Sequence, residues 1–232
     1  GYIDHYNYVF PFLFDNKISG FFYPPIKTTE NKMVLDVNKI HLILAKEKNK
    51  KKIINLIFHF LKRLFGISAD NLKLDKIKLT SRFDDKDTML IKTLLQHHLP
   101  FKHRRRVLDE IFFKILRSNE AELAKKIYMG KKHIIEMSQN SMIFGSHGYN
   151  HYWWEFLSLK DQEKELKNSI NYFKKIKLFN ERFSVCYPFG SYNNDSIKLL
   201  KKYRIAFAFT TKPGSINRRN FGKKFNFPRY DT

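Results

Sequence analysis

Residues 141–151 have the sequence SMIFGSHGYNH, in which a short apolar segment leads directly into two histidines. Residues 141–145 predict a buried strand, because a brief apolar run that ends at a glycine is typical of a strand inside a sheet. His147 and His151 are four positions apart, so both imidazoles lie on one face if the loop turns into a helix. Histidines at this spacing can bind one metal ion, and the alternative is a pair of unrelated loop histidines.

Strands and helices alternate on both sides of this segment. The aromatic run at residues 21–23 predicts a buried strand, which Pro24 and Pro25 end. After the histidines, the pattern predicts in order a helix at 159–177, a strand at 183–187, a helix at 196–203 and a strand at 205–210. This alternation is typical of α/β proteins, in which helices connect parallel strands. In such folds functional residues lie on loops at the carboxyl ends of the strands.

The stretch between these two parts, residues 34–137, has a helical pattern instead. Apolar residues recur at intervals of three and four in several successive segments, as expected for helices that bury one face. In the first of these segments the residues expected on the buried face are Val37, Ile40, His41 and Leu44. The sequence therefore predicts a helical block inserted into the α/β framework.

Composition excludes several classes of protein. Of the 232 residues, 43% are hydrophobic and 16% aromatic, which excludes an intrinsically disordered chain. No apolar run approaches the roughly 18 residues that a membrane-spanning helix needs, so no transmembrane segment is expected. The single cysteine, Cys186, cannot form a disulfide within the chain. A lone cysteine favours a reducing compartment, so a cytoplasmic location is expected.

The net charge is +22, from 44 Lys and Arg against 22 Asp and Glu. Dense basic clusters occur only at residues 46–52 and 104–106, and the other lysines punctuate amphipathic segments. A solvated, lysine-rich surface is therefore favoured, and no nucleic-acid partner is expected. A basic nucleic-acid-binding protein is kept as an alternative, because a positive field attracts polyanions.

The histidine segment also resembles a known motif. Residues 145–151 resemble the His-(Ser/Thr)-x-x-His motif of the polysaccharide deacetylases, the NodB-homology esterases of carbohydrate esterase family 4. Other landmarks come in that family's order. Residues 1–6, with Pro11 and the strand at 21–22, resemble the end of the Thr-Phe-Asp-Asp-Gly motif and the segment after it, with Gly1 as its glycine. Residues 187–193 and 206–211 resemble the third motif and the strand after it.

The resemblance implies an α/β fold of the distorted (β/α) barrel type, with the first strand missing. It implies a single domain over residues 1–232, incomplete at both ends, with a helical insertion at about 35–135. That insertion is similar to one in deacetylases of bacterial surface-polysaccharide synthesis. The implied activity is removal of N-acetyl groups from a sugar of such a polysaccharide or its precursor. The alternative within the same fold is a non-catalytic carbohydrate-binding member.

The resemblance also implies roles for particular residues. His147 and His151 would bind a divalent metal, expected to be zinc, and the Phe189 backbone N–H would stabilise the oxyanion. The family's two aspartates, the third ligand and the general base, would both precede Gly1, so the chain is expected to be inactive by itself. The residues expected to contact the carbohydrate substrate are Tyr149, Tyr187, Pro188, Tyr192 and Arg229.

One departure from the family pattern and one imitation of it bear on this assignment. Cys186 occupies the position of an arginine that orients the catalytic carboxylate, so that support would either differ or come from Arg229. The tripeptide Phe83-Asp84-Asp85 imitates the aspartate motif, but Lys86 follows it where the motif has glycine. Asp84 and Asp85 are better explained as acidic residues at the start of a helix, where the helix dipole favours them.

Overall fold

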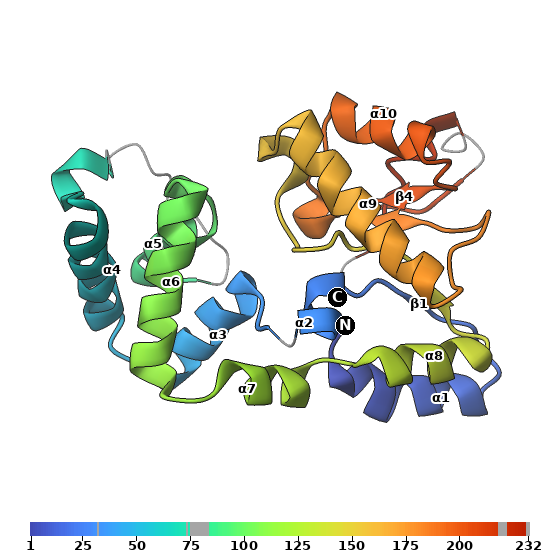
Figure 1. Ribbon diagram of the computed structural model, residues 1–232, viewed down its shortest axis with the longest axis horizontal. Coiled ribbons are helices and arrows are strands. Elements are labelled where there is room, and N and C mark those ends of the chain that lie inside the picture. The colour runs from blue at the N-terminus through green and yellow to red at the C-terminus, as the bar shows by residue number, and fades with distance from the viewer. Residues whose placement is uncertain (32, 73, 75–83, 218–221, 231–232) are drawn as a thin grey trace. The chain divides into compact units, whose positions relative to one another are not determined.

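The computed structural model describes residues 1–31, 33–72, 74, 84–217 and 222–230. The chain forms two compact units. Unit 1 comprises Gly1–Met33 and Ala121–Thr232, and unit 2 comprises Val34–Glu120 (Figure 1). All strands of the described residues belong to unit 1, whereas the described part of unit 2 is helical.

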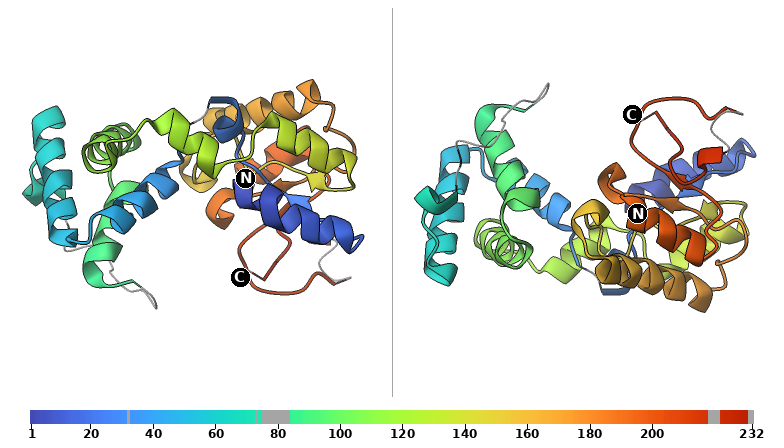
Figure 2. Two further views of the ribbon diagram at one scale, coloured as in Figure 1. Left: turned by 90° about the horizontal axis from the view of Figure 1, so that it is seen from below. Right: turned by 90° about the horizontal axis from the view of Figure 1, so that it is seen from above.

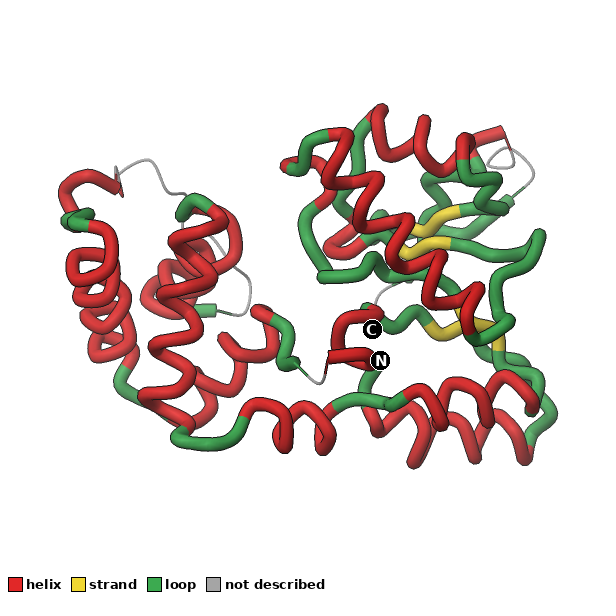
Figure 3. The backbone as a smooth tube through the Cα atoms, viewed as in Figure 1, coloured by secondary structure: helices red, strands yellow, loops and turns green. Residues whose placement is uncertain are grey.

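Unit 1 is built on four short strands, β1 (Phe21–Phe22), β2 (Ile143–Phe144), β3 (Val185–Cys186) and β4 (Ala208–Phe209). β1 pairs in parallel with β2, and β3 pairs in parallel with β4. A parallel bridge between Ser146 and Val185 joins the two pairs, so the strands follow one another in chain order. The parallel α/β arrangement expected from the sequence is confirmed, although helices contribute far more of the backbone than strands do (Figure 3).

Aromatic rings connect the first strand with the fourth. The ring centroids of Phe21 and Phe207 are 6.4 Å apart, and those of Tyr23 and Phe209 are 6.0 Å apart. Because β1 and β4 are not paired with each other, these contacts mean that the row of strands curves until its outer members face one another. The described residues thus form small curved sheets, and a closed barrel is not seen among them.

The helices of unit 1 precede, separate and cover these strands. They are a π-helical turn (His5–Val9), α1 (Phe10–Asp15), α2 (Ile26–Asn31), α8 (Lys131–Gln139), α9 (Leu159–Lys175) and α10 (Asn194–Lys202), with short 3-10 turns at Trp154–Phe156 and Pro188–Gly190. α7 (Glu120–Ile127) begins at the last residue of unit 2. α9 and α10 pack against each other (Figure 2).

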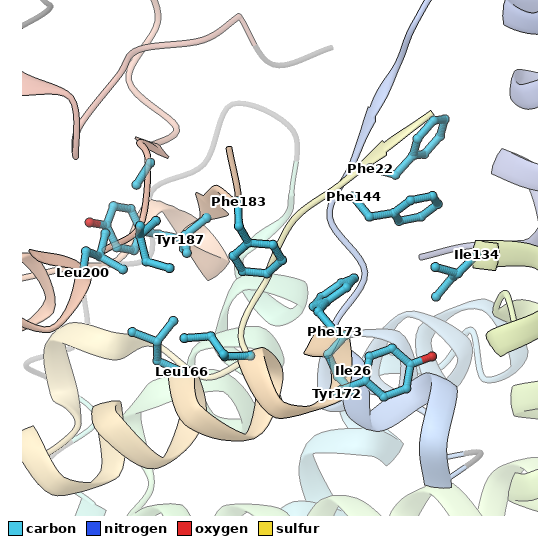
Figure 4. Close-up of a cluster of buried hydrophobic side chains, with 14 of the residues drawn as sticks. Phe22, Ile26, Ile134, Phe144, Leu166, Tyr172, Phe173, Phe183, Tyr187 and Leu200 are labelled. Carbon is cyan, nitrogen blue, oxygen red and sulfur yellow. The ribbon is translucent and has the colours of Figure 1, made fainter. Parts of the chain in front are cut away.

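The core of unit 1 lies between the strands and these helices. Phe22 and Phe144 stack with ring centroids 5.7 Å apart, and Phe173 and Phe183 meet edge to face at 5.0 Å. Figure 4 shows these four rings together with residues from α2, α8, α9 and α10. Burial of such large side chains contributes the main favourable term to folding.

α9 is the helix that connects the histidine loop to the core. It begins after Ser158, whose hydroxyl accepts a hydrogen bond from the Asp161 N–H. Its buried residues recur at intervals of three and four, so one stripe of the helix faces inward. That stripe includes Gln162, Glu165, Leu166, Ser169, Ile170 and Phe173.

Unit 2 contains α3 (Asp36–Lys46), α4 (Lys50–Phe65), α5 (Lys86–Thr93) and α6 (Phe101–Leu116), with helical turns at Ala69–Leu72 and Leu94–His98. α6 packs against both α3 and α4. This unit ends earlier than the insertion expected at about 35–135, because α8 belongs to unit 1. Within the described ranges, the chain has no helix with the length and apolar character needed to cross a bilayer.

Candidate metal site

His147 and His151 face one another at the carboxyl end of β2. Their Nε2 atoms lie 3.2 Å apart, and their ring centroids 4.7 Å apart. Two zinc–nitrogen bonds of about 2.0–2.1 Å at a tetrahedral angle span roughly 3.3 Å. The spacing of the two nitrogens therefore fits two ligands of one zinc ion.

The hydrogen bond of the His147 ring leaves its Nε2 atom available as a ligand. Nδ1 of His147 lies 2.6 Å from the carbonyl oxygen of Cys186, and a carbonyl can only accept, so Nδ1 is the protonated nitrogen. The Nε2 atom of His151 faces that of His147. Metal-binding histidines commonly donate their other ring N–H to a carbonyl or carboxylate in this way. Two lone pairs at this distance repel each other unless a proton or a cation lies between them.

Burial keeps both imidazoles neutral. The pKa of His147 is about 4, lowered chiefly by burial and also by the positive charge of Arg229, while the bond to Cys186 opposes the shift. Burial also holds the pKa of His151 well below its usual value, and His147 adds to the effect. Neutral imidazole is the form that binds a metal. At neutral pH both rings are therefore ready to coordinate.

The backbone at this site is strained at two bulky residues. His151 has φ +64° and Phe189 has φ +58°, in the left-handed region that side chains other than glycine rarely adopt. Their ring centroids are 4.7 Å apart, and the Phe189 ring also stacks on Trp153 at 4.4 Å. Strain of this kind, of about 1–3 kcal/mol per residue, concentrates at functional sites.

The loop that carries the histidines is held from both sides by hydrogen bonds. Oε2 of Glu165, on α9, accepts the backbone N–H groups of Tyr149 at 3.0 Å and Asn150 at 2.8 Å. Oε1 of the same carboxylate accepts the side-chain amide of Asn150. From the opposite side, the backbone N–H of Lys27 donates to the carbonyl of Tyr149 at 2.9 Å.

A second contact ties the start of the loop to α9. The hydroxyl oxygens of Ser146 and Ser169 are 2.7 Å apart, and the Gly148 N–H donates to Ser146 at 3.1 Å. Both serines are fully buried. Gly148 has φ +73°, and a Cβ there would lie 3.3 Å from Glu165. The lack of a side chain at Gly148 thus allows both the left-handed turn and the close approach of the Glu165 carboxylate.

The structure places the predicted substrate residues in different environments. Tyr187 is buried, and its hydroxyl donates to the carbonyl of Phe225 at 3.0 Å. Tyr192 stacks on Tyr187 at 4.8 Å, and Pro188 lies next to the histidine loop, 3.5 Å from where a Cβ of Gly148 would be. The Tyr149 side chain is partly buried against the core of unit 1.

Arg229 lies near the histidines. Its guanidinium donates to the Thr210 carbonyl at 3.0 Å, just beyond β4, and its charge lowers the pKa of His147. Cys186 contributes its backbone carbonyl to His147, while its side chain is buried. The histidines, Pro188, Phe189 and Arg229 therefore share the carboxyl end of the strands.

A complete ligand set is not found in the described part of the chain, where no group of three or more His, Cys, Asp or Glu side chains could hold a metal. Asp84 and Asp85 belong to unit 2, and Phe83 lies outside the described residues. Asp85 caps α5 by accepting the Thr88 N–H at 3.0 Å, and Lys92 pairs with Asp84. Their interpretation as acidic residues at a helix start is confirmed.

The two dense basic stretches lie in unit 2, where several of their charges are paired. Lys50 forms an ion pair with Asp85, Lys52 with Glu47, and Arg106 with Glu110. Such pairs reduce the field that a polyanion would meet. Their pairing favours the explanation of a solvated surface.

A cavity of about 450 Å³ opens at the other end of the strands. Its lining includes Phe21, Ile143, Phe183 and Phe207, which lie at or before the amino ends of the four strands. It is therefore separate from the histidines, which follow the carboxyl end of β2.

Glu165 is the site residue that sequence reasoning missed. The signal available was its place on the buried stripe of α9 between Gln162 and Leu166, because an unpaired carboxylate is rarely buried. Two of the three partners of that carboxylate are backbone N–H groups, which no residue type identifies in the sequence. The left-handed backbone of Phe189 gave no signal either, because a bulky aromatic residue rarely adopts it.

Comparison with known proteins identifies the family of the chain. The sequence matches the polysaccharide deacetylase family over residues 75–208, more than half of the chain. The matched range includes part of the helical block as well as both histidines. The polysaccharide deacetylase YxkH of Bacillus subtilis is 26% identical over 97 residues, which are 41% of this chain and 34% of that protein. The chain thus spans about a third of the length of this curated relative.

Two solved structures are also similar. A Streptococcus pyogenes deacetylase, PplD, determined in complex with acetate, has 27% identity and a TM-score of 0.43 over 47% of each chain. The deacetylase domain of BpsB from Bordetella bronchiseptica has 13% identity and a TM-score of 0.49, over 99% of this chain and 67% of that one. With the family match over more than half of its length, this chain belongs to the polysaccharide deacetylase family.

Proposed function

We propose that this chain supplies the histidine ligands of a zinc-dependent deacetylase centre that removes N-acetyl groups from a sugar. The observation that carries the proposal is the 3.2 Å separation of the His147 and His151 Nε2 atoms, with both rings neutral and Nδ1 of His147 donating to the Cys186 carbonyl. A divalent cation held there supplies Lewis acidity toward a carbonyl and a water molecule. Membership of the family supports the reaction class.

The third ligand and the general base are proposed to come from residues that precede Gly1. The support is positional: a Cβ on Gly1 would lie 3.1 Å from Pro24, and Ile26, two residues further on, donates to the carbonyl of Gly148 in the histidine loop. A carboxylate adjoining Gly1 is thus within range of the site. Without it, the chain is expected to bind zinc weakly and to release no acetate.

The chain's own residues would orient the substrate. The Phe189 N–H, fixed by the left-handed backbone at that residue, is proposed to donate to the oxyanion that forms when the amide is attacked. The Trp153 and Phe189 rings offer aromatic surface beside His151, suited to packing against a sugar. A bacterial surface polysaccharide or its precursor is the substrate class we propose.

The test measures zinc binding and acetate release separately. Isothermal titration with zinc alone should show one site in the 232-residue chain, lost in both His147→Ala and His151→Ala and retained in the exposed control His59→Ala. Acetate release from N-acetylated oligosaccharides should require the chain extended upstream of Gly1 by an aspartate pair. Zinc affinity equal in wild type and His147→Ala would refute the metal site.

A second candidate function is carbohydrate binding without catalysis. The observation that favours it is the lack of a third ligand for the histidines among the described residues. If an upstream extension restores neither tight zinc binding nor acetate release, while the chain still binds N-acetylated oligosaccharides, this second function is the correct one.

A further inference from the structure

Glu165 is a buried carboxylate outside the set of proposed ligands. The residue is 3% exposed, and burial raises the pKa of its side chain. Lys27 contributes a positive charge nearby, but Glu165 forms no ion pair with any described lysine, arginine or histidine side chain. An ionised carboxylate in this position is costly unless hydrogen bonds compensate for lost hydration. The groups that donate hydrogen bonds to Glu165 therefore indicate its role.

The hydrogen bonds of Glu165 go to the segment between the two histidines. Its two oxygens accept the N–H groups of Tyr149 and Asn150 and the side-chain amide of Asn150. His151 follows Asn150 directly, and its backbone has the strained φ of +64°. The direction of the His151 ring thus depends on the conformation that these three bonds hold.

The other side of the loop is bonded to the start of α2. The N–H groups of Ile26 and Lys27 donate to the carbonyls of Gly148 and Tyr149 at 3.4 Å and 2.9 Å. The loop therefore lies between two donors on α2 and one acceptor on α9. Removing the acceptor leaves two partly buried N–H groups unpaired, and the loop can then relax away from the strained conformation.

We propose that Glu165 is a positioning residue that holds His147 and His151 at the spacing required to bind one metal ion. The inference rests on the proposed metal site, because it concerns the same two rings. Glu165 acts through the loop backbone, and its carboxylate is not itself a ligand. Supporting groups around metal ligands typically change metal affinity by about 10–100-fold when they are removed.

The experiment compares two substitutions on the same helix. Glu165→Gln keeps the size of the side chain but removes its charge and leaves one acceptor oxygen for the three N–H donors of the loop. Glu163→Gln is the matched control, since Glu163 pairs with Lys202 and Tyr203 away from the loop. Zinc affinity, measured by calorimetry on the full chain, should fall about tenfold or more in Glu165→Gln and stay within about twofold in the control.

A spectroscopic measurement separates positioning from general destabilisation. Cobalt bound in place of zinc should show an altered visible absorption band in Glu165→Gln, at a temperature where circular dichroism shows both proteins fully folded. A residue that only stabilised the fold would lower the melting temperature and leave the cobalt spectrum unchanged. An unchanged spectrum together with unchanged zinc affinity would overturn the inference.

The outcomes also distinguish this inference from the proposed function. If wild type and His147→Ala bind zinc equally, the metal site itself is wrong. If His147→Ala loses zinc while Glu165→Gln retains it, only the role of Glu165 is wrong. If Glu165→Gln does not fold, Asn150→Ala tests the inference instead. This variant removes the bond from the Asn150 side chain and keeps the two bonds from the backbone N–H groups of Tyr149 and Asn150. Its zinc affinity should fall about threefold, and wild-type affinity there would overturn the inference.

Discussion

Nδ1 of His147 and the backbone carbonyl oxygen of Cys186 lie 2.6 Å apart. This bond joins the loop after β2 to the end of β3, and it sets which nitrogen of His147 carries the proton. Because the acceptor belongs to the backbone, the histidine can keep its tautomer whatever side chain residue 186 has. Cys186 in place of the family's arginine therefore keeps the hydrogen bond that orients His147.

The first prediction concerns Cys186. Cys186→Ala should leave zinc affinity within about twofold of wild type, because the carbonyl that orients His147 remains. The free energy of unfolding should fall by about 1 kcal/mol, since a small buried side chain is shortened. Calorimetry with zinc and urea unfolding check the two parts. A loss of zinc binding as large as that of His147→Ala would show that the thiol takes part in the site.

The second prediction concerns Gly145, which directly follows β2 and lies against the Tyr23 side chain. A Cβ on Gly145 would overlap the Tyr23 ring and the Ser184 carbonyl, and the Tyr23 hydroxyl already bonds Ser184 at 2.8 Å. Gly145→Ala should lower the free energy of unfolding by about 2 kcal/mol, because neither backbone nor ring can move freely. Gly222→Ala is the control, since nothing lies within 4 Å of its Cβ position. Equal stability of the two variants would contradict the close packing of Gly145 against Tyr23 and Ser184.

Much of unit 1 could be predicted from the sequence because its signals are local. The strands were expected where apolar runs end at prolines or glycines, and the histidine pair was expected because it follows one of them directly. The role of Glu165 could not be predicted, since the residues it joins are separated by the length of the loop and half of α9. Every residue except proline has a backbone N–H, so the sequence does not show which of these groups bind the carboxylate.

Helix orientation in unit 2 shows another limit of sequence patterns. Apolar periodicity placed His41 on the buried face of α3, but His41 is exposed and Lys39 is buried beside Ile40 and Ile43. The cause is tertiary, because Asp109 and Glu120 pair with Lys39 and allow its charge to be buried. A pattern that counts only apolar residues cannot anticipate a lysine whose partners come from distant segments.

The third prediction concerns that buried lysine. Lys39 Nζ lies 2.6 Å from Asp109 and 2.9 Å from Glu120. Lys39→Met should lower the free energy of unfolding of unit 2 by about 3–5 kcal/mol, because two carboxylates lose their shared cation. The control Lys52→Met removes an exposed pair with Glu47 and should cost less than about 1 kcal/mol. Circular dichroism during urea unfolding measures both, and comparable losses would refute a special role for the buried lysine.

The last prediction concerns pH and His5, whose ring centroid lies 5.7 Å from that of Phe22. The pKa of His5 is lowered from 6.5 to about 4, chiefly by burial, while the charge of Asp4 opposes the shift. Between these two pH values the unfolded chain binds a proton that the folded chain does not. The free energy of unfolding should therefore fall as the pH drops from 6.5 toward 4.

His5→Gln isolates this contribution, because glutamine stays neutral throughout the range. His5 is only partly buried, so solvent screening reduces the expected effect to about 1 kcal/mol. Urea unfolding at about pH 7 and about pH 4.5 should show a smaller loss of stability in His5→Gln than in wild type. The control His59→Gln, at an exposed position, should keep the wild-type loss. A pH dependence that is the same in all three proteins would mean that His5 titrates normally in the folded state and that its ring is not shielded from water by Phe22.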